Sequence, residues 1–138
     1  MKRSLTHIVF WVCISTGLLL SCSKKKQLPQ DYELATAWAD MTNYITKTTP
    51  SNSPTFASRC FGYIGLTMYE SIAAGDSVYQ SVAGQLNGLG QLPEPEPGQI
   101  YNWHLALNAG QAEILRNIYI QTSDENKEKI DSLEKHFE

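Results

Sequence analysis

The side chains that could carry acid–base or metal chemistry are few and widely spaced in this sequence. Beyond the first thirty residues the histidines are His104 and His136; neither has a second histidine four residues away, and no CxxC pair exists. The chain also lacks a GxSxG nucleophile elbow and a glycine-rich phosphate loop. The residues of a Ser-His-Asp site meet only in the folded protein, so the sequence does not exclude such a site. We nevertheless expect His104 to be a partly buried histidine with its hydrogen bonds satisfied. The sequence therefore predicts no metal ligand, no cofactor site and no catalytic residue in this chain.

Cysteine chemistry is expected at Cys22. The chain begins with the basic Met1-Lys2-Arg3, continues with an apolar stretch over residues 8–20, and reaches Cys22 directly after Ser21. A basic start, an apolar stretch too short for a membrane span and small residues after it are typical of a secretory signal peptide. Leu19-Leu20-Ser21-Cys22 also resembles the lipobox of bacterial lipoproteins, in which the cysteine sulfur is acylated after cleavage. The alternative is an uncleaved anchor helix, and the abrupt end of the apolar stretch at Cys22 argues against it.

Three segments follow from this interpretation: a signal peptide over residues 1–21, an acylated tether over 22–30 and a helical domain over 31–138. We expect an exported protein, lipid-anchored to the cell envelope and facing the periplasm. Ser23 supplies no inner-membrane retention acid, which favours the outer membrane. The basic run at residues 24–26 is expected to contact anionic head groups. Eleven Lys and Arg face fourteen Asp and Glu, a net charge of −3, which argues against nucleic-acid binding.

The domain is predicted to be all-α, with helices over residues 31–47, 54–74 and 99–120, a fourth helix after a Thr122 cap, and an extended connection over 77–98. In the third helix the expected core stripe passes through Ile100, Trp103, Leu107, Gly110, Ile114 and Ile118. The apolar stripe of the fourth helix still continues at its last residues, which predicts an incomplete, N-terminal portion of a larger helical bundle.

The second predicted helix is apolar on nearly all sides, which indicates a central helix that neighbours cover on several faces. Phe61→Asp and Ile64→Asp are therefore both expected to unfold the domain. Glycines at 62 and 65 indicate close approach by another helix. Cys60 is expected to be a buried structural thiol rather than a nucleophile. Arg59 and Glu70 are expected to meet charges on other helices.

The order of Pro54, Arg59 and Met68-Tyr69-Glu70 on this helix is similar to that in the vanadium-dependent haloperoxidase-like proteins of the type 2 phosphatidic acid phosphatase superfamily. The resemblance covers residues 32–138, and the order of its motifs carries it: Pro54, Arg59, Met68-Tyr69-Glu70, Tyr79-Gln80-Ser81, then Tyr101-Asn102-Trp103-His104. It implies a helical bundle that holds vanadate or a phosphate ester between cationic side chains and a histidine.

None of the three catalytic motifs of that family is present in this chain. Ser58-Arg59 looks like the start of the last motif, but Gly65 stands where its histidine belongs, so no catalytic residue is carried over. The resemblance implies the N-terminal segment of such a lipoprotein, inactive alone, with vanadate possible only for a full-length relative. The alternative is a self-contained helical envelope lipoprotein that binds a protein partner. In the first case, apolar surface on residues 56–73 and 103–118 would favour self-association.

Overall fold

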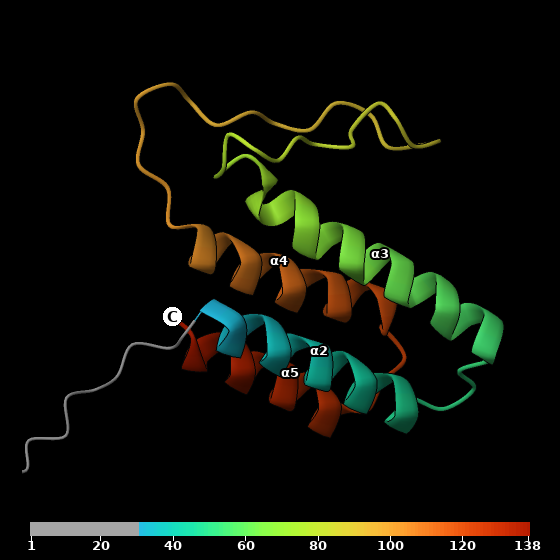
Figure 1. Cartoon of the computed structure of the whole chain (residues 1–138). Coiled ribbons are helices and arrows are strands. Elements are labelled where there is room, and N and C mark those ends of the chain that lie inside the picture. The colour runs from blue at the N-terminus through green and yellow to red at the C-terminus, as the bar shows by residue number, and fades with distance from the viewer. Residues whose placement is uncertain (1–30) are drawn as a thin grey trace, which may run out of the picture.

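The computed structural model describes residues 31–138 and confirms the all-α prediction, since no strand occurs within this range. Four helices follow one another: α2 (Asp31–Thr48), α3 (Pro54–Ala73), α4 (Trp103–Ile118) and α5 (Asp124–His136) (Figure 1). A long non-helical connection joins α3 to α4. The predicted signal peptide, Cys22 and the tether lie outside the described residues. None of the described helices combines the length and apolarity that a membrane crossing requires.

Local sequence signals explain where these helices begin. Ser53 caps α3 by accepting a 3.2 Å hydrogen bond from the Phe56 N–H, and Pro54 occupies the first turn, where its missing N–H costs nothing. Asn102 caps α4, so this helix starts later than the predicted residue 99. Ser123 caps α5, and the predicted Thr122 cap is wrong.

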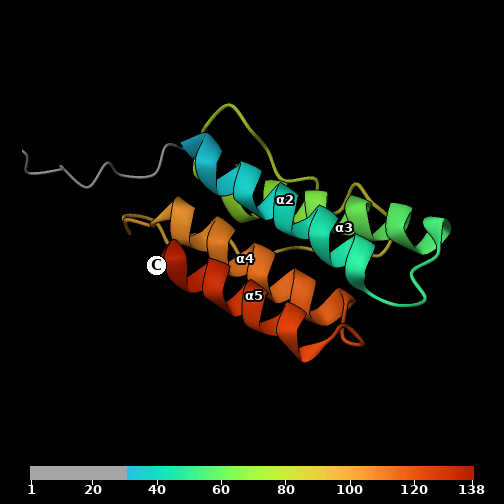
Figure 2. The same ribbon diagram turned by 90° about the horizontal axis from the view of Figure 1, so that it is seen from below.

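The central helix is α4, which packs against α3, α5 and α2. In Figure 1, α4 lies between α3 on one side and α2 with α5 on the other, and Figure 2 shows the same neighbours from below. The prediction of a central α3 is wrong. Only Cys60, Ile64 and Ala73 are buried on α3, because one strip of this helix meets α4 and no helix covers the rest.

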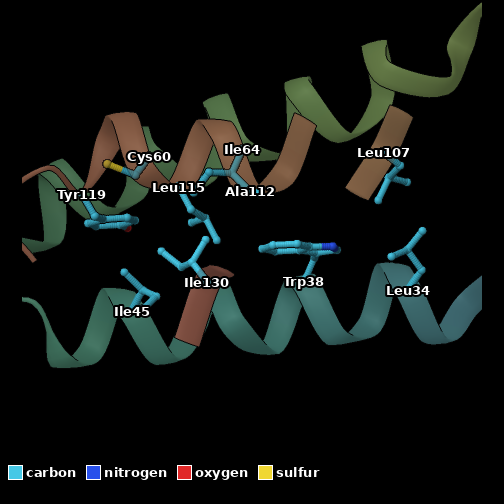
Figure 3. Packing of buried hydrophobic residues seen from close by; sticks show 10 residues of the cluster. All are labelled: Leu34, Trp38, Ile45, Cys60, Ile64, Leu107, Ala112, Leu115, Tyr119 and Ile130. Atoms are coloured by element: carbon cyan, nitrogen blue, oxygen red, sulfur yellow. The ribbon is translucent and has the colours of Figure 1, made fainter. Parts of the chain in front are cut away.

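All four described helices contribute to the core: α2 and α4 supply most of its buried side chains, α3 supplies Cys60 and Ile64, and α5 supplies Ile130 (Figure 3). Its fully buried apolar side chains are Trp38, Ile45, Ala112, Leu115, Tyr119 and Ile130. Burying a large apolar side chain contributes roughly 1.5–3 kcal/mol. Cys60 and Ile64 are the α3 members of this cluster, so the prediction of a buried thiol at Cys60 is confirmed.

Two fully buried amide side chains on α4 link the other helices to it. Asn108 accepts a 2.9 Å hydrogen bond from Trp38 Nε1 of α2, and its own Nδ2 donates to the Glu134 carbonyl of α5 at 2.8 Å. Gln111 Nε2 donates to the Ile64 carbonyl of α3 at 3.2 Å. Buried amides stabilise a fold when partners satisfy them. Asn108 is paired through both its oxygen and its nitrogen, whereas Gln111 Oε1 has no hydrogen-bond partner within the described residues.

The close helix approach occurs at Gly110 of α4 and not at the predicted glycines of α3. A Cβ at Gly110 would collide with Ser71 Oγ and lie 3.5 Å from Thr67 Cγ2, both on α3. A Cβ at Gly62 or Gly65 would have no heavy atom within 4 Å. The prediction from Gly62 and Gly65 is therefore not borne out within the described helices, and these two positions face open space.

Candidate functional site: an uncovered helix face

The chemistry-bearing side chains do not assemble into a reaction centre within residues 31–138. Antiparallel packing of α4 and α5 brings the first turn of α4, with His104, and the last turn of α5, with His136, to the same end of the molecule (Figure 2). His104 is exposed, so its expected partial burial is wrong. His136 is also exposed and stacks edge-on against Phe137, with ring centroids 4.9 Å apart. In the described range no three His, Cys, Asp or Glu side chains gather as a metal site would require.

Arg116 is engaged in an ionic cluster between α4 and α5. Its Nη2 and Nε donate to Asp131 Oδ1 at 2.7 and 3.0 Å, and Nη2 also donates to a Glu134 carboxylate oxygen. The hydrogen bond with Glu134 raises the pKa of the Arg116 guanidinium, against partial burial that lowers it. The cluster is partly exposed, so it contributes little net stability. Its geometry gives Arg116 a role in fixing α5 on α4 and commits its Nε and Nη2 donors to carboxylates.

Tyr119 is a buried polar residue that the sequence analysis did not single out. Its hydroxyl lies 2.6 Å from Thr46 Oγ1 of α2, and its ring meets Phe56 of α3 edge-on at 6.3 Å. Burial raises the pKa of the Tyr119 hydroxyl above its ordinary value of 10.0, while the Thr46 hydrogen bond opposes this shift and nearby Cys60 adds to it. The sequence signal for the burial of Tyr119 was its position one helical turn after Leu115, on the same side of the helix. The arrangement joins three helices and offers no substrate access.

The two α3 charges do not meet charges on other helices, so that prediction is wrong. Arg59 is exposed and makes no hydrogen bond or ion pair with any described residue. Glu70 is half-buried, and its Oε1 accepts a 2.8 Å hydrogen bond from the Val82 backbone N–H in the connection. The reason is the packing: the sides of α3 that carry Arg59 and Glu70 face solvent and the connection, not a helix.

What the structure does present is a largely uncovered surface on α3, named here the α3 face: Ser58, Phe61, Gly62, Gly65 and Ile72 are exposed, and Leu66 is half-buried. Phe61 is 42% exposed and Ile72 38%. Tyr63 is 53% exposed beside it. A soluble protein seldom leaves several large apolar side chains uncovered on one helix unless that surface binds something. This face is the candidate functional site.

The connection between α3 and α4 covers only the last turns of α3. Tyr69 Oη donates to the Gln80 carbonyl at 2.6 Å, and Glu70 accepts from Val82. Between this connection and the end of α3 lies a hollow of about 240 Å³ with Glu70 and Glu94 in its wall. The first three turns of α3 have no equivalent cover, so the α3 face is open along most of its length.

A second hollow lies between α2 and α5 on the other side of the molecule. It has a volume of about 370 Å³ and is open to solvent, and its walls are mostly apolar: Ala37, Asp40, Met41, Tyr44, Lys129 and Leu133. Lys129 Nζ lies 5.4 Å from the centre of the Tyr44 ring, a cation–π contact that partly closes it. It holds no arrangement of polar groups that would orient a small molecule.

Comparison with known proteins finds no matching protein-family model, no matching curated protein and no matching solved structure. The resemblance to haloperoxidase-like proteins therefore stays a prediction from the sequence.

Proposed function

We propose that this chain is a helical docking module of the bacterial cell envelope, and that α3 is its binding helix. The observation that carries the proposal is the α3 face, because an amphipathic bundle normally turns such side chains inward. The expected lipid anchor at Cys22 would place this face at the membrane, facing the periplasm. In this role the chain acts by holding another protein element and not by catalysis.

One candidate for that element is the remainder of a larger haloperoxidase- or phosphatase-like bundle. The residues that carry most of the family resemblance, Pro54, Arg59 and Met68-Tyr69-Glu70, all lie on α3, the helix that carries the α3 face. Further helices packing on α3 would complete the bundle and would supply the cations and the histidine that this chain lacks. Vanadate would then bind in the completed protein.

The other candidate is a self-contained lipoprotein that docks a separate protein. The supporting observation is the closed core between the four described helices, in which Trp38, Ile45, Leu115 and Ile130 have no exposed surface. A unit with a finished core needs no further helices in order to fold. It would use the α3 face only to bind.

The size of the protein in the cell envelope separates the two candidates. An antibody against the helical domain should detect a band at or slightly below the 15.5 kDa of this chain if the module is self-contained. A much larger band, with vanadate-dependent bromination in the same fraction, would support the completed bundle.

For the chain itself we predict no turnover in a vanadate-supported bromination assay or in p-nitrophenyl phosphate hydrolysis. The reason is that stabilising a phosphate-like transition state takes several converging cations and an acid–base group. Arg116 is engaged with α5, and Arg59 has no second cation beside it on α3. Activity above background that disappears in His104→Ala would contradict the prediction, and the exposed His136→Ala serves as its control.

A further inference from the structure

The charges beside the α3 face are arranged in a self-complementary way. Arg59 and Glu70 lie eleven residues apart, which is close to three full helical turns, so both project from the same flank of α3. At 1.5 Å per residue they are about 16 Å apart along the axis, too far to pair within one chain. Arg59 has no partner among the described residues, and only one oxygen of Glu70 is engaged.

A second copy of α3 would satisfy both charges if it packed antiparallel about a two-fold axis. In such a pair each flank of one helix faces the same flank of the other, because the two-fold axis runs perpendicular to both helices. With the axis passing between Ile64 and Gly65, Arg59 of one copy lies opposite Glu70 of the other. The symmetry then repeats this contact, giving two ion pairs across one interface.

The shape of the α3 face suits the same arrangement. Gly65 lies next to the proposed axis and faces open space, as does Gly62, so two backbones could approach closely there. Phe61 and Ile72 lie on the flank opposite to the charges and would bury their exposed rings and methyl groups against the partner. Because the connection covers the last turns of α3, the helices must cross at an angle, as ridges-into-grooves packing allows.

A membrane surface fits this side of the molecule less well. The connection that borders the α3 face carries Asp76, Glu94 and Glu96, all exposed, and no lysine or arginine. Anionic head groups would be repelled by these carboxylates. The one cation on α3, Arg59, has its matching acid on α3 itself.

We propose that the occupant of the α3 face is a second copy of this chain, packed as an antiparallel, two-fold symmetric α3–α3 pair that Arg59 and Glu70 hold in register. This inference rests on the docking role proposed for α3 and names its partner. It also assigns Gly65 as the position nearest the symmetry axis.

The test uses cysteine cross-linking of the full chain in envelope membranes. Gly65→Cys should give a disulfide-linked band of twice the mass under mild oxidation, since the two copies of residue 65 are neighbours across the axis. Ser132→Cys, exposed on α5, is the matched control and should stay monomeric. The native Cys60 is buried and should not cross-link.

Charge reversal then tests the register in the Gly65→Cys background. Arg59→Glu alone or Glu70→Arg alone should lower cross-linking roughly tenfold, because each places like charges opposite one another at both contacts. Co-expression of the two variants should restore it, since the mixed pair has both contacts opposite in sign. Circular dichroism of each variant checks that Glu70→Arg, which loses the Val82 contact, still folds.

Maleimide labelling of opened envelope membranes, in which the exposed control Ser132→Cys must react rapidly, separates failure of this inference from failure of the docking role. Gly65→Cys that is protected from the reagent but forms no self-cross-link would overturn the second copy while leaving α3 a docking helix. Rapid labelling of Gly65→Cys would sink both. Cross-linking that charge reversal leaves unchanged would show a different register and also contradict the proposal.

Discussion

Buried polar side chains in this protein act as links between helices. Asn108 joins α2 and α5 to α4 through two hydrogen bonds, and Tyr119 joins α4 to α2 through Thr46. Thr49, Thr122 and Asn126 form a similar buried seam where α2 ends beside the α4–α5 turn. Each group has a protein partner, which is the condition under which buried polar groups stabilise a fold. At the scale of the residue, the polar chemistry of the core is therefore structural.

Tyr119→Phe should lower the free energy of unfolding by about 1 kcal/mol at neutral pH, since it removes a buried hydrogen bond and leaves Thr46 Oγ1 with one partner fewer. It should also change the pH dependence. The raised pKa of Tyr119 means that the unfolded chain releases this proton first as pH rises above 10.0, so stability falls there.

Urea denaturation of the wild type and Tyr119→Phe between pH 8 and pH 11 measures both effects. The loss of stability above pH 10 should be smaller in the variant than in the wild type. Tyr32→Phe, at a position that is 68% exposed, should follow the wild type at every pH. Parallel curves for the wild type and Tyr119→Phe would mean that this hydroxyl titrates as it would in water.

At the scale of the element, the apolar content of a helix does not predict whether it lies at the centre or the edge of the bundle. The helix richest in apolar residues, α3, lies at the edge, and α4, which carries Asn108 and Gln111 in its buried strip, lies at the centre. The amides can be buried because neighbouring helices offer them a carbonyl or an N–H donor. The second face of α3 stays exposed because no helix within residues 31–138 covers it.

Two aspartate substitutions three residues apart on α3 should therefore differ in their effect. Ile64 is 4% exposed, so Ile64→Asp buries an unpaired carboxylate and should unfold a domain whose total stability is on the order of 5–15 kcal/mol. Phe61 is 42% exposed, so Phe61→Asp should leave the domain folded, with a change of no more than about 1 kcal/mol.

Thermal melting followed by circular dichroism distinguishes these outcomes, with Phe61→Ala and Ile64→Ala as the size controls. If Phe61→Asp also loses its cooperative transition, then the α3 face is covered in solution and contributes to folding. That result would favour an obligate partner over a reversible one.

At the scale of the whole molecule, the two sides differ in character. The side of α2 and α5 carries most of the charge and several short-range ion pairs, such as Lys127 with Asp124 and Lys129 with Glu125. The side of α3 and the connection carries exposed apolar groups, including Val78, Tyr79 and Ile100. One side suits contact with water, and the other suits contact with protein.

Anchoring is the prediction that belongs to this scale. Cys22→Ser should prevent acylation and shift the protein out of the membrane fraction, because two or three acyl chains, at about 0.8 kcal/mol for each buried CH₂, provide the attachment. Mass spectrometry of the wild type should find an acylated Cys22 as its first residue. An intact Met1 peptide in the membrane fraction would instead indicate an uncleaved anchor.

Local features of this protein followed from the sequence alone. The helical class, the approximate bounds of the helices and the buried thiol of Cys60 were predicted and are confirmed. Each depends on signals within a few residues, namely periodicity, capping side chains and proline, which act before any tertiary contact forms. The three-turn spacing of Arg59 and Glu70 on α3 also follows from the sequence once the helix is predicted.

Only the tertiary structure decided which helix is central and which face is left open. The periodicity of apolar residues shows which faces of a helix are apolar, but it does not show how many helices will pack against them. The helix α3 is apolar on nearly all sides and was therefore expected at the centre. No local pattern marks the amides Asn108 and Gln111 as buried, because their hydrogen-bond partners Trp38, Glu134 and Ile64 come from other helices. Gly110, and not Gly62 or Gly65, became the close contact for the same reason: packing partners come from distant parts of the chain, and local pattern carries no record of them.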